Sequence, residues 1–409
     1  MACHVRIDCR DEFMTETLLK MRIDTNDYNE FRDPLRALCS DFPPEYWRKL
    51  EDNPPDQRYP TDFADAIIAS GFFAALIEED FGGAGLPLRV AAVILETIHS
   101  TPCNASCVLG QMFLSTILGK HGSEAQKNEF LPRIAAGETR FLAAAISEDE
   151  SGSDLAAMQT RAEKRGDRWV INGTKHWVNN ARHTDIMLLL ARTSEAPEGG
   201  DPCDGLTAFL VDIPKARENG MSAELIDAMI NSNSENLVFE DLELPADAVV
   251  GEVGKGYDYY RELAEIECIL CAACASGDSD FFSEKAVNYA NERIVFGRPI
   301  SYNQGIQFPI SKAYVEVQGA KLIGNKAAAI YDAGKRPGAT ASMAKHMACE
   351  AAWNMADACF TTHGGFAFAR EYDVERKWRD VRIMQMAPQG TNMLLSDIGE
   401  NNLGMPRSF

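Results

Sequence analysis

The pattern of apolar and polar positions changes twice along the chain. From about residue 26 to residue 140, apolar residues recur at helical spacing, as in YPTDFADAIIASGFFAALI, where Thr61 or Asp62 is expected to cap the helix. A second helix is expected in SEAQKNEFLPRIAAG, with Ser123 as its N-cap and Gly137 at its end. The pattern therefore predicts a helical N-terminal segment.

From about residue 141 to residue 255, apolar residues alternate with polar ones or form short runs, which is typical of strands. RWVINGTKHWVNN alternates on both sides of Asn172-Gly173, a pair favoured in hairpin turns, so a hairpin is expected there. Further strands are expected in FLAAAI, DIMLLLART, LTAFLVDI and ENLVFEDLELP. This part of the chain predicts a middle β-domain.

Helical periodicity returns after Gly256 and continues to the end of the chain. Helices are expected at 257–294, 303–334, 338–363, 371–384 and 391–402. Strands and helices do not alternate as in parallel βαβ units, and no G-x-G-x-x-G opens a helix, so a Rossmann dinucleotide site is not expected. The prediction is an α+β multi-domain fold with four parts, namely an N-terminal extension (1–25) and domains at 26–140, 141–255 and 256–409.

Composition limits the possible partners. The chain of 409 residues has a formal net charge of -21, which argues against nucleic acid and against an anionic membrane surface. No apolar run approaches the roughly 18 residues of a transmembrane helix, and the start of the chain lacks the apolar core of a signal peptide. Acidic residues in that region count against an organelle transit peptide, so a cytoplasmic protein is expected.

The cysteines are expected to be reduced thiols. Three of them, Cys268, Cys271 and Cys274, have the C-x2-C-x2-C spacing used by iron–sulfur proteins. Their flanks contain no glycine or proline before Gly277 and look helical, so packing of a buried helix is favoured over a cluster. The seven histidines form no H-E-x-x-H pair, and no metal site is expected.

Glu267 is the first candidate for chemistry. It lies on an apolar helical stripe made by Leu263, Ile266, Leu270, Ala273, Cys274 and Gly277, whereas Glu265 points elsewhere. A carboxyl on such a face should have a raised pKa unless it is paired, as a general base near neutrality requires. Periodicity alone leaves open the alternative of an acid at the helix edge in a salt bridge.

Two other segments carry polar or charged groups that are able to hold a ligand. In SEDESGSDL, the serines Ser147, Ser151 and Ser153 follow an apolar strand and can offer hydrogen bonds, although a solvated turn is the alternative. In NERIVFGRPI, Arg293 and Phe296 stand at a helix end closed by Gly297, where they can grip a phosphate and a ring. A capping charge is the alternative there.

Taken together, these segments resemble the acyl-CoA dehydrogenases, which are FAD flavoproteins. SEDESGSD resembles T-E-P-G-A-G-S-D, and NGTKHWVNNA resembles N-G-x-K-x-W-I-T-N. The segments YANERIVFGRPISYNQ and HGGFAFAREYDVERKWRD resemble the family's R-x-x-F-G and G-G…V-E-R-x-x-R-D motifs. The resemblance covers nearly the whole chain from about residue 26. It implies a helical N-terminal domain, a β-barrel-like middle domain and a C-terminal four-helix bundle, assembled as a homotetramer or homodimer.

The resemblance also implies contacts to FAD and to substrate. Ile146, Ser147 and Ser153 would line the isoalloxazine and the pyrophosphate, and Trp177 and Asn179 would contact the flavin. Thr391 would also bind FAD. Five would reach FAD held by a neighbouring subunit: Arg293, Phe296, Gln304, Gly364 and Gly365. Ser151 and Gly390 would contact substrate. The chain departs from the motifs at Asn179 (Thr in the family), at Thr361 (Gln), and at Asp149 and Glu150 (Pro-Gly).

The catalytic base implied by the resemblance is Glu267. Many family members carry their base in Y-E-G-T, but this chain has APQGT, with Gln389 at the position of that glutamate. One branch instead places its base on the first helix of the C-terminal domain, 26 residues before the arginine of R-x-x-F-G, and that count from Arg293 gives Glu267. Gln389 would keep a backbone N–H for the thioester carbonyl. Cys268 replaces the branch's usual arginine, which leaves the carboxyl more easily protonated.

The function implied is dehydrogenation of an acyl-CoA, with electrons passed to an electron-transfer flavoprotein. Alternatives are a lyase or another flavoprotein of the same fold, or a non-catalytic acyl-CoA-binding subunit. The sequence does not identify the acyl group. Gln111 or Ser115, in the helical region expected to line its pocket, can hydrogen-bond a polar chain or can be ordinary packing residues.

Overall fold

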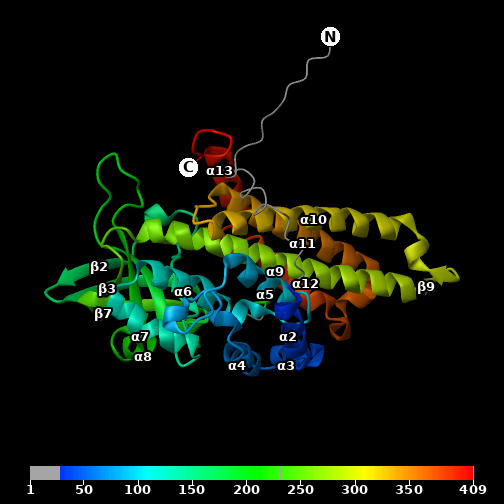
Figure 1. The fold of residues 1–409 in the computed structure, drawn as a ribbon, viewed down its shortest axis with the longest axis horizontal. Coiled ribbons are helices and arrows are strands. Elements are labelled where there is room, and N and C mark those ends of the chain that lie inside the picture. The colour runs from blue at the N-terminus through cyan, green and yellow to red at the C-terminus, as the bar shows by residue number, and fades with distance from the viewer. Residues whose placement is uncertain (1–27, 231–232, 409) are drawn as a thin grey trace, which may run out of the picture.

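A computed structural model describes residues 28–230 and 233–408 of the chain (Figure 1). The expected extension, residues 1–25, lies outside the described residues. The N-terminal part is helical, as expected, with α2 (Asn29–Ser40), α3 (Pro44–Glu51), α4 (Thr61–Ala69), α5 (Leu88–His99), α6 (Leu109–His121) and α7 (Glu124–Ala135). Short 3-10 turns join the longer elements at Pro55–Gln57, Phe72–Ala74, Glu79–Phe81, Ala105–Cys107, Leu155–Ala157, Ala246–Ala248, Ile300–Tyr302, Gly364–Phe368 and Arg370–Tyr372.

The two expected helix starts in this part have different outcomes. Ser123 caps α7 in a capping box with Gln126, and Gly137 follows the helix with a φ of 73°. The expected cap of α4 was wrong, because Pro60 occupies the N-cap position and no side chain bonds there. Thr61 is already the first residue of the helix.

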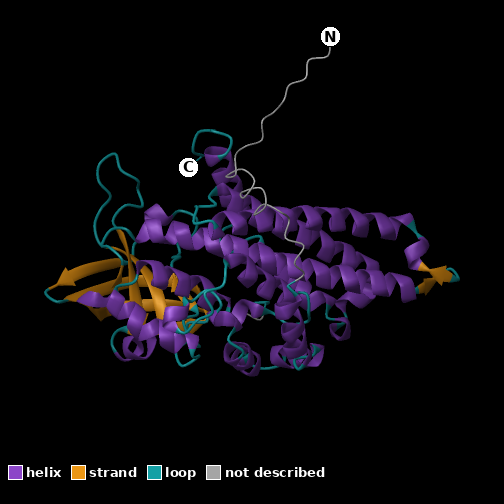
Figure 2. Ribbon diagram, viewed as in Figure 1, coloured by secondary structure: helices purple, strands orange, loops and turns teal. Residues whose placement is uncertain are grey.

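The middle part is one mixed sheet of eight strands (Figure 2). Its strands are β1 (Ala143–Ala145), β2 (Arg161–Arg165), β3 (Arg168–Asn179), β4 (Ile186–Arg192), β5 (Leu206–Asp212), β6 (Met221–Leu225), β7 (Ser234–Pro245) and β8 (Val249–Val250), with α8 (Ile213–Glu218) between β5 and β6. The strand order is β6-β7-β3-β2-β4-β5-β8, and β1 pairs in parallel with β4. Side chains such as Trp169, Phe209 and Phe239 fill a second core, separate from the main one.

The expected hairpin at Asn172-Gly173 was wrong. The turn between β2 and β3 lies at residues 166 and 167, since Arg165 pairs with Arg168. Gly173 is inside β3, at a shift in its register with β7, and its φ is 146°. A Cβ there would come within 2.6 Å of the Thr160 Cα, so the glycine serves a close approach of two backbones rather than a turn.

The C-terminal part consists of α9 (Gly256–Glu292), α10 (Gln304–Asp332), α11 (Ala339–His363), α12 (Val374–Met384) and α13 (Thr391–Asn401). The helices α9, α10 and α11 pack on one another, and α12 and α13 pack on α11. Figure 1 shows α9 running from the sheet at one end of the molecule to a small hairpin at the other. That hairpin, β9 (Ile294–Val295) and β10 (Arg298–Pro299), corrects the expectation that Gly297 closes the helix, because α9 ends at Glu292 and Phe296-Gly297 form the hairpin turn.

The α+β fold with helical, sheet and helical parts in that order is confirmed. Within the described residues, no helix is long and apolar enough to cross a membrane.

Candidate active site

Glu267 lies on α9 with a half-buried side chain. Its expected stripe is confirmed, since Leu263, Ile266 and Leu270 are all buried in the main core. Glu265 faces away and forms a two-bond salt bridge with Arg336, with both N–O distances at 2.7 Å. Among the described residues Glu267 itself has no ion pair. Burial raises the pKa of Glu267 to about 7, against the opposing charge of Lys345.

The turn that carries Gln389 lies against this part of α9. The Cys268 thiol donates to Gln389 Oε1 at 2.9 Å. The residue at the position of the usual catalytic glutamate therefore contacts the residue that replaces the branch's usual arginine. Lys345 on α11 donates to the carbonyls of Ala387 (2.8 Å) and Gln389 (2.7 Å). In the part of the chain that the structure describes, the backbone N–H of Gln389 has no acceptor. The turn that carries this N–H is therefore bonded to α9, the helix that carries the carboxyl of raised pKa.

The loop after β1 is held in place by the buried ion pair between Lys175 and Glu148. Lys175 Nζ donates to the carbonyl of Ile146 and to Glu148, both at 2.8 Å. The Glu148 carboxylate also accepts from the backbone N–H groups of Gln159 and Thr160. Burial lowers the pKa of Lys175 to about 8, and the Glu148 carboxylate opposes that shift. The backbone around Ile146 and Ser147 is therefore held rigidly, next to Ser151, whose buried hydroxyl has no partner in the described residues.

Trp177 is presented to solvent by an irregular stretch of β3. The register of β3 against β7 shifts between Lys175 and Val178, and Trp177 has a φ of 57°. Its indole is 56% exposed, although it leaves a strand whose neighbours Lys175 and Val178 are buried. A bulky residue in the left-handed region is strained, and such strain is typical of functional sites. Nearby, the Ser234 hydroxyl donates to Asn179 Oδ1 at 2.5 Å, which fixes that amide.

These features fit a flavin on the chain's own side of the site. An exposed flat indole, a rigid loop that offers serine hydroxyls, and a fixed amide together suit a planar ring system and its polar substituents. Gly390 and Thr391, at the start of α13, are half-buried in the same part of the C-terminal segment as Gln389.

A second group of the expected FAD residues lies far from Glu267, near the other end of α9. Arg293 follows Glu267 by 26 residues, which is about 39 Å along the axis of α9 at 1.5 Å per residue. The Arg293 guanidinium stacks over Phe366 at 5.5 Å, and Phe296 at the hairpin tip is fully exposed. Gln304, Gly364 and Gly365 are exposed as well. Glu267 and Arg293 are therefore too far apart to contact one flavin ring within a single chain.

Other parts of the expected chemistry have simpler outcomes. Cys268, Cys271 and Cys274 are buried free thiols inside α9, which confirms the helix expected there. In the described residues no cluster of three metal-ligand side chains occurs. Gln111 and Ser115 are buried on α6, and their Oε1 and Oγ atoms have no partner among the described residues.

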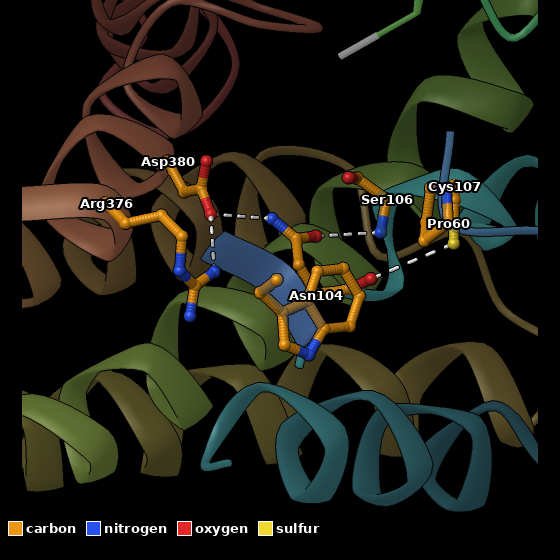
Figure 3. Close-up of a pocket in the computed structure, with 7 residues that line it drawn as sticks. Pro60, Asn104, Ser106, Cys107, Arg376 and Asp380 are labelled. Carbon is orange, nitrogen blue, oxygen red and sulfur yellow. Dashed lines mark hydrogen bonds and ion pairs between the residues drawn. The ribbon is translucent and has the colours of Figure 1, made fainter. Parts of the chain in front are cut away.

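Two cavities lie elsewhere. One holds about 10 Å³, room for a single water, beside Asn104 (Figure 3). There the Asn104 side chain accepts from the Ser106 N–H and donates to Asp380, so it ties the N-terminal part to α12. A larger cavity of about 390 Å³, lined by Phe281, Tyr289, His363 and Tyr372 among others, lies near the Arg293 end of α9.

Sequence reasoning missed Lys345 and Lys175. Both are completely buried lysines. The signal was present for Lys345, because it lies on the small-residue face of α11 with Ala341, Ala348 and Ala352, just as Glu267 lies on an apolar face of α9.

Comparison with known proteins identifies the family. The acyl-CoA dehydrogenase N-terminal, middle and C-terminal domain families match residues 25–138, 143–242 and 254–403. The chain is 33% identical over 352 residues to cyclohex-1-ene-1-carbonyl-CoA dehydrogenase of Syntrophus aciditrophicus (strain SB), covering 85% of this chain and 83% of that protein. It is 33% identical over 319 residues to the mitochondrial short-chain specific acyl-CoA dehydrogenase of Homo sapiens, covering 77% and 76%.

Solved structures agree. The glutaryl-coenzyme A dehydrogenase glutaryl-CoA complex superposes with a TM-score of 0.83 at 25% identity, covering 100% of this chain and 98% of the other. A chain in the structure of the electron transferring flavoprotein of Acidaminococcus fermentans has a TM-score of 0.82 at 25% identity, covering 91% and 98%. The protein therefore belongs to the acyl-CoA dehydrogenase family, the FAD-dependent oxidoreductases that act on CH–CH bonds.

Proposed function

We propose that the protein dehydrogenates an acyl-CoA thioester between its α and β carbons and that Glu267 is the base. The observation that carries this proposal is the environment of Glu267, a half-buried carboxyl that lacks an ion pair among the described residues. Its pKa of about 7 suits proton abstraction near neutrality. Gln389 is a neutral amide and has no such capacity.

The chain's own residues supply proton transfer and stabilisation of charge. Glu267 takes the proton from the carbon next to the thioester carbonyl, and negative charge then develops on the carbonyl oxygen. The backbone N–H of Gln389 donates to that oxygen and stabilises it as the charge forms. Bound FAD supplies the acceptor for the hydride that leaves the β carbon.

Electrons then pass to an electron-transfer flavoprotein. The support is the family itself and the similarity to a chain from the electron transferring flavoprotein structure. We further propose that Arg293, Phe296, Gln304, Gly364 and Gly365 contact the FAD of a second copy of the chain. The separation of about 39 Å along α9 between Glu267 and Arg293 supports this assignment.

The test compares Glu267→Gln with Glu265→Gln in the FAD-containing protein. Dehydrogenation is measured with a dye acceptor and a panel of short, branched, aromatic and long acyl-CoA thioesters. Glu267→Gln is expected to lose at least roughly a thousandfold in kcat, because the general base is removed. Glu265→Gln is the matched control, since it removes a carboxylate two residues away that pairs with Arg336, and it should stay within a few-fold of the parent protein.

Gln389→Ala keeps the backbone N–H and is expected to retain most activity. An inactive Gln389→Ala together with an active Glu267→Gln would reject the assignment. If no thioester is oxidised but one is cleaved or rearranged, the non-oxidative reading of this fold replaces the proposal.

A further inference from the structure

Lys345 is an unusual residue for its position. It is 0% exposed and lies between small side chains of α11, including Ala344 and Ala348. Among the described residues, no carboxylate lies within ion-pair distance of its ammonium. Burying a cation without a carboxylate partner is unfavourable for folding, so the position of this lysine needs an explanation other than stability.

Its hydrogen bonds indicate that purpose. Lys345 Nζ holds the carbonyls of Ala387 (2.8 Å) and Gln389 (2.7 Å), which belong to the two peptide units on either side of the unit that joins Pro388 to Gln389. That middle unit carries the free N–H. Because both flanking units are tied to one ammonium, the direction in which this N–H points is fixed.

The side chain of Gln389 is held from another helix. Cys268 on α9 donates to Gln389 Oε1 at 2.9 Å and is buried. Burial raises the pKa of the Cys268 thiol to about 12, so it keeps its proton and remains a donor. The turn is thus attached to α11 through its main chain and to α9 through its side chain.

We propose that Lys345 and Cys268 are positioning residues that clamp the Gln389 turn, with Lys345 aiming the N–H at the substrate carbonyl and Cys268 holding the turn against the helix that carries Glu267. This inference rests on the proposed function, because the N–H matters only if a thioester carbonyl is its acceptor. Lys345 and Cys268 would act on the reaction only through the turn that they hold.

The clamp also places a charge near the base. Among the described residues, the titratable groups that interact electrostatically with Glu267 are Tyr260, Cys268 and Cys271 on its own helix and Lys345 on α11, and Lys345 is the charged one. Glu265 and Arg336 neutralise each other on the other face. Replacing Lys345 by a neutral residue should therefore raise the pKa of Glu267 further.

The experiment uses the FAD-containing protein with Lys345→Met and Cys268→Ala. Hydrogen exchange of the peptide covering 385–391 is measured by mass spectrometry, together with kcat, KM and the pH profile of kcat/KM. For Lys345→Met we expect hydrogen exchange at least roughly tenfold faster in this peptide but not in remote peptides. We also expect kcat to be lower by roughly 10- to 100-fold with KM changed only a few-fold, because one transition-state hydrogen bond is misaligned. The acid limb of the profile should move to higher pH. Cys268→Ala should speed exchange less and leave the acid limb in place, because the thiol is neutral.

Unchanged exchange in the 385–391 peptide of Lys345→Met would overturn the clamp. If Lys345→Met does not fold, Lys345→Gln serves instead. The amide of Lys345→Gln can still donate to one carbonyl, so its exchange rate should lie between those of the parent protein and Lys345→Met. The acid limb should move to higher pH, because the charge is lost. An unmoved acid limb or unchanged exchange would overturn the proposal. The exchange readout does not depend on catalysis, so a failed clamp is distinguishable from a failed assignment of Glu267.

Discussion

At the scale of single residues, the site depends on charges placed where an apolar core would be expected. Glu267 on α9 and Lys345 on α11 form no ion pair with each other. Nearby, Glu265 and Arg336 form a salt bridge. The contrast is informative because α9 carries both acids two residues apart. Burial raises the pKa of Glu267 so that the carboxylate can accept a proton, and the Lys345 cation limits that rise, so that the carboxylate is still present near neutral pH.

This arrangement predicts a pH-dependent cost to stability. The pKa of Glu267 is raised from its ordinary value to about 7 on folding, so its contribution is complete below about pH 4.5 and is lost as the pH rises through about 7. The lost stability is at most about 3 kcal/mol, and solvent reaching the half-buried carboxyl reduces it. Thermal unfolding of the FAD-containing protein from about pH 5.5 to pH 8 should show the parent protein losing stability relative to Glu267→Gln. Parallel curves for the two proteins would contradict the raised pKa.

At the scale of elements, the sequence predicted helices well and the sheet less well. The periodic stripe of α9 predicted both its helix and the burial of Leu263 and Leu270, because a helix face is a local property. The pair Asn172-Gly173 led to the wrong prediction of a hairpin turn. A strand paired on both sides can use the same glycine for close packing, and the choice between a turn and close packing depends on the neighbouring strand. The bonds from Lys345 and Cys268 to the Gln389 turn join segments distant in sequence, so no local pattern could reveal them.

Gly173 gives the prediction at this scale. In Gly173→Ala the new Cβ would meet Thr160 at 2.5–2.8 Å, and the φ of 146° is strained for alanine. The variant should lose about 1–3 kcal/mol, seen as a lower unfolding temperature, and should bind FAD more weakly because Trp177 follows in the same strand. Gly324→Ala on α10 is the control, because a Cβ there meets nothing within 4 Å; helix propensity favours alanine there. Equal stability of the two variants would show that β3 can shift to accept the side chain.

At the scale of the whole molecule, α9 separates Glu267 from Arg293 by a distance that a single flavin ring cannot span. Its one end lies beside the sheet and its other end carries the β9–β10 hairpin (Figure 1). Large apolar side chains are exposed at the hairpin end, among them Ile294, Phe296 and Tyr302. We therefore expect each complete site to combine Glu267 of one copy with Arg293 of another.

Subunit mixing tests that expectation. Glu267→Gln and Arg293→Ala should each be nearly inactive alone, the first without its base and the second without its grip on FAD. When the two are produced together, a mixed assembly contains sites in which Glu267 and the partner's Arg293 are both intact. Activity well above the sum of the separate variants is expected in the mixed, purified protein. Activity equal to that sum would place both residues in the site of one chain.

The central claim is that Glu267 removes the α-proton, and the most direct measurement is anaerobic stopped-flow mixing with the best thioester over a range of pH. In the parent protein, the second-order rate constant for loss of flavin absorbance should increase with pH, with an apparent pKa near 7. This apparent pKa is that of the base in the protein without substrate. Glu267→Gln with FAD bound should show no loss of absorbance on that time scale, and Glu265→Gln should match the parent protein. Bleaching of Glu267→Gln at the parent rate, or a rate in the parent protein that does not depend on pH across neutrality, would contradict the account.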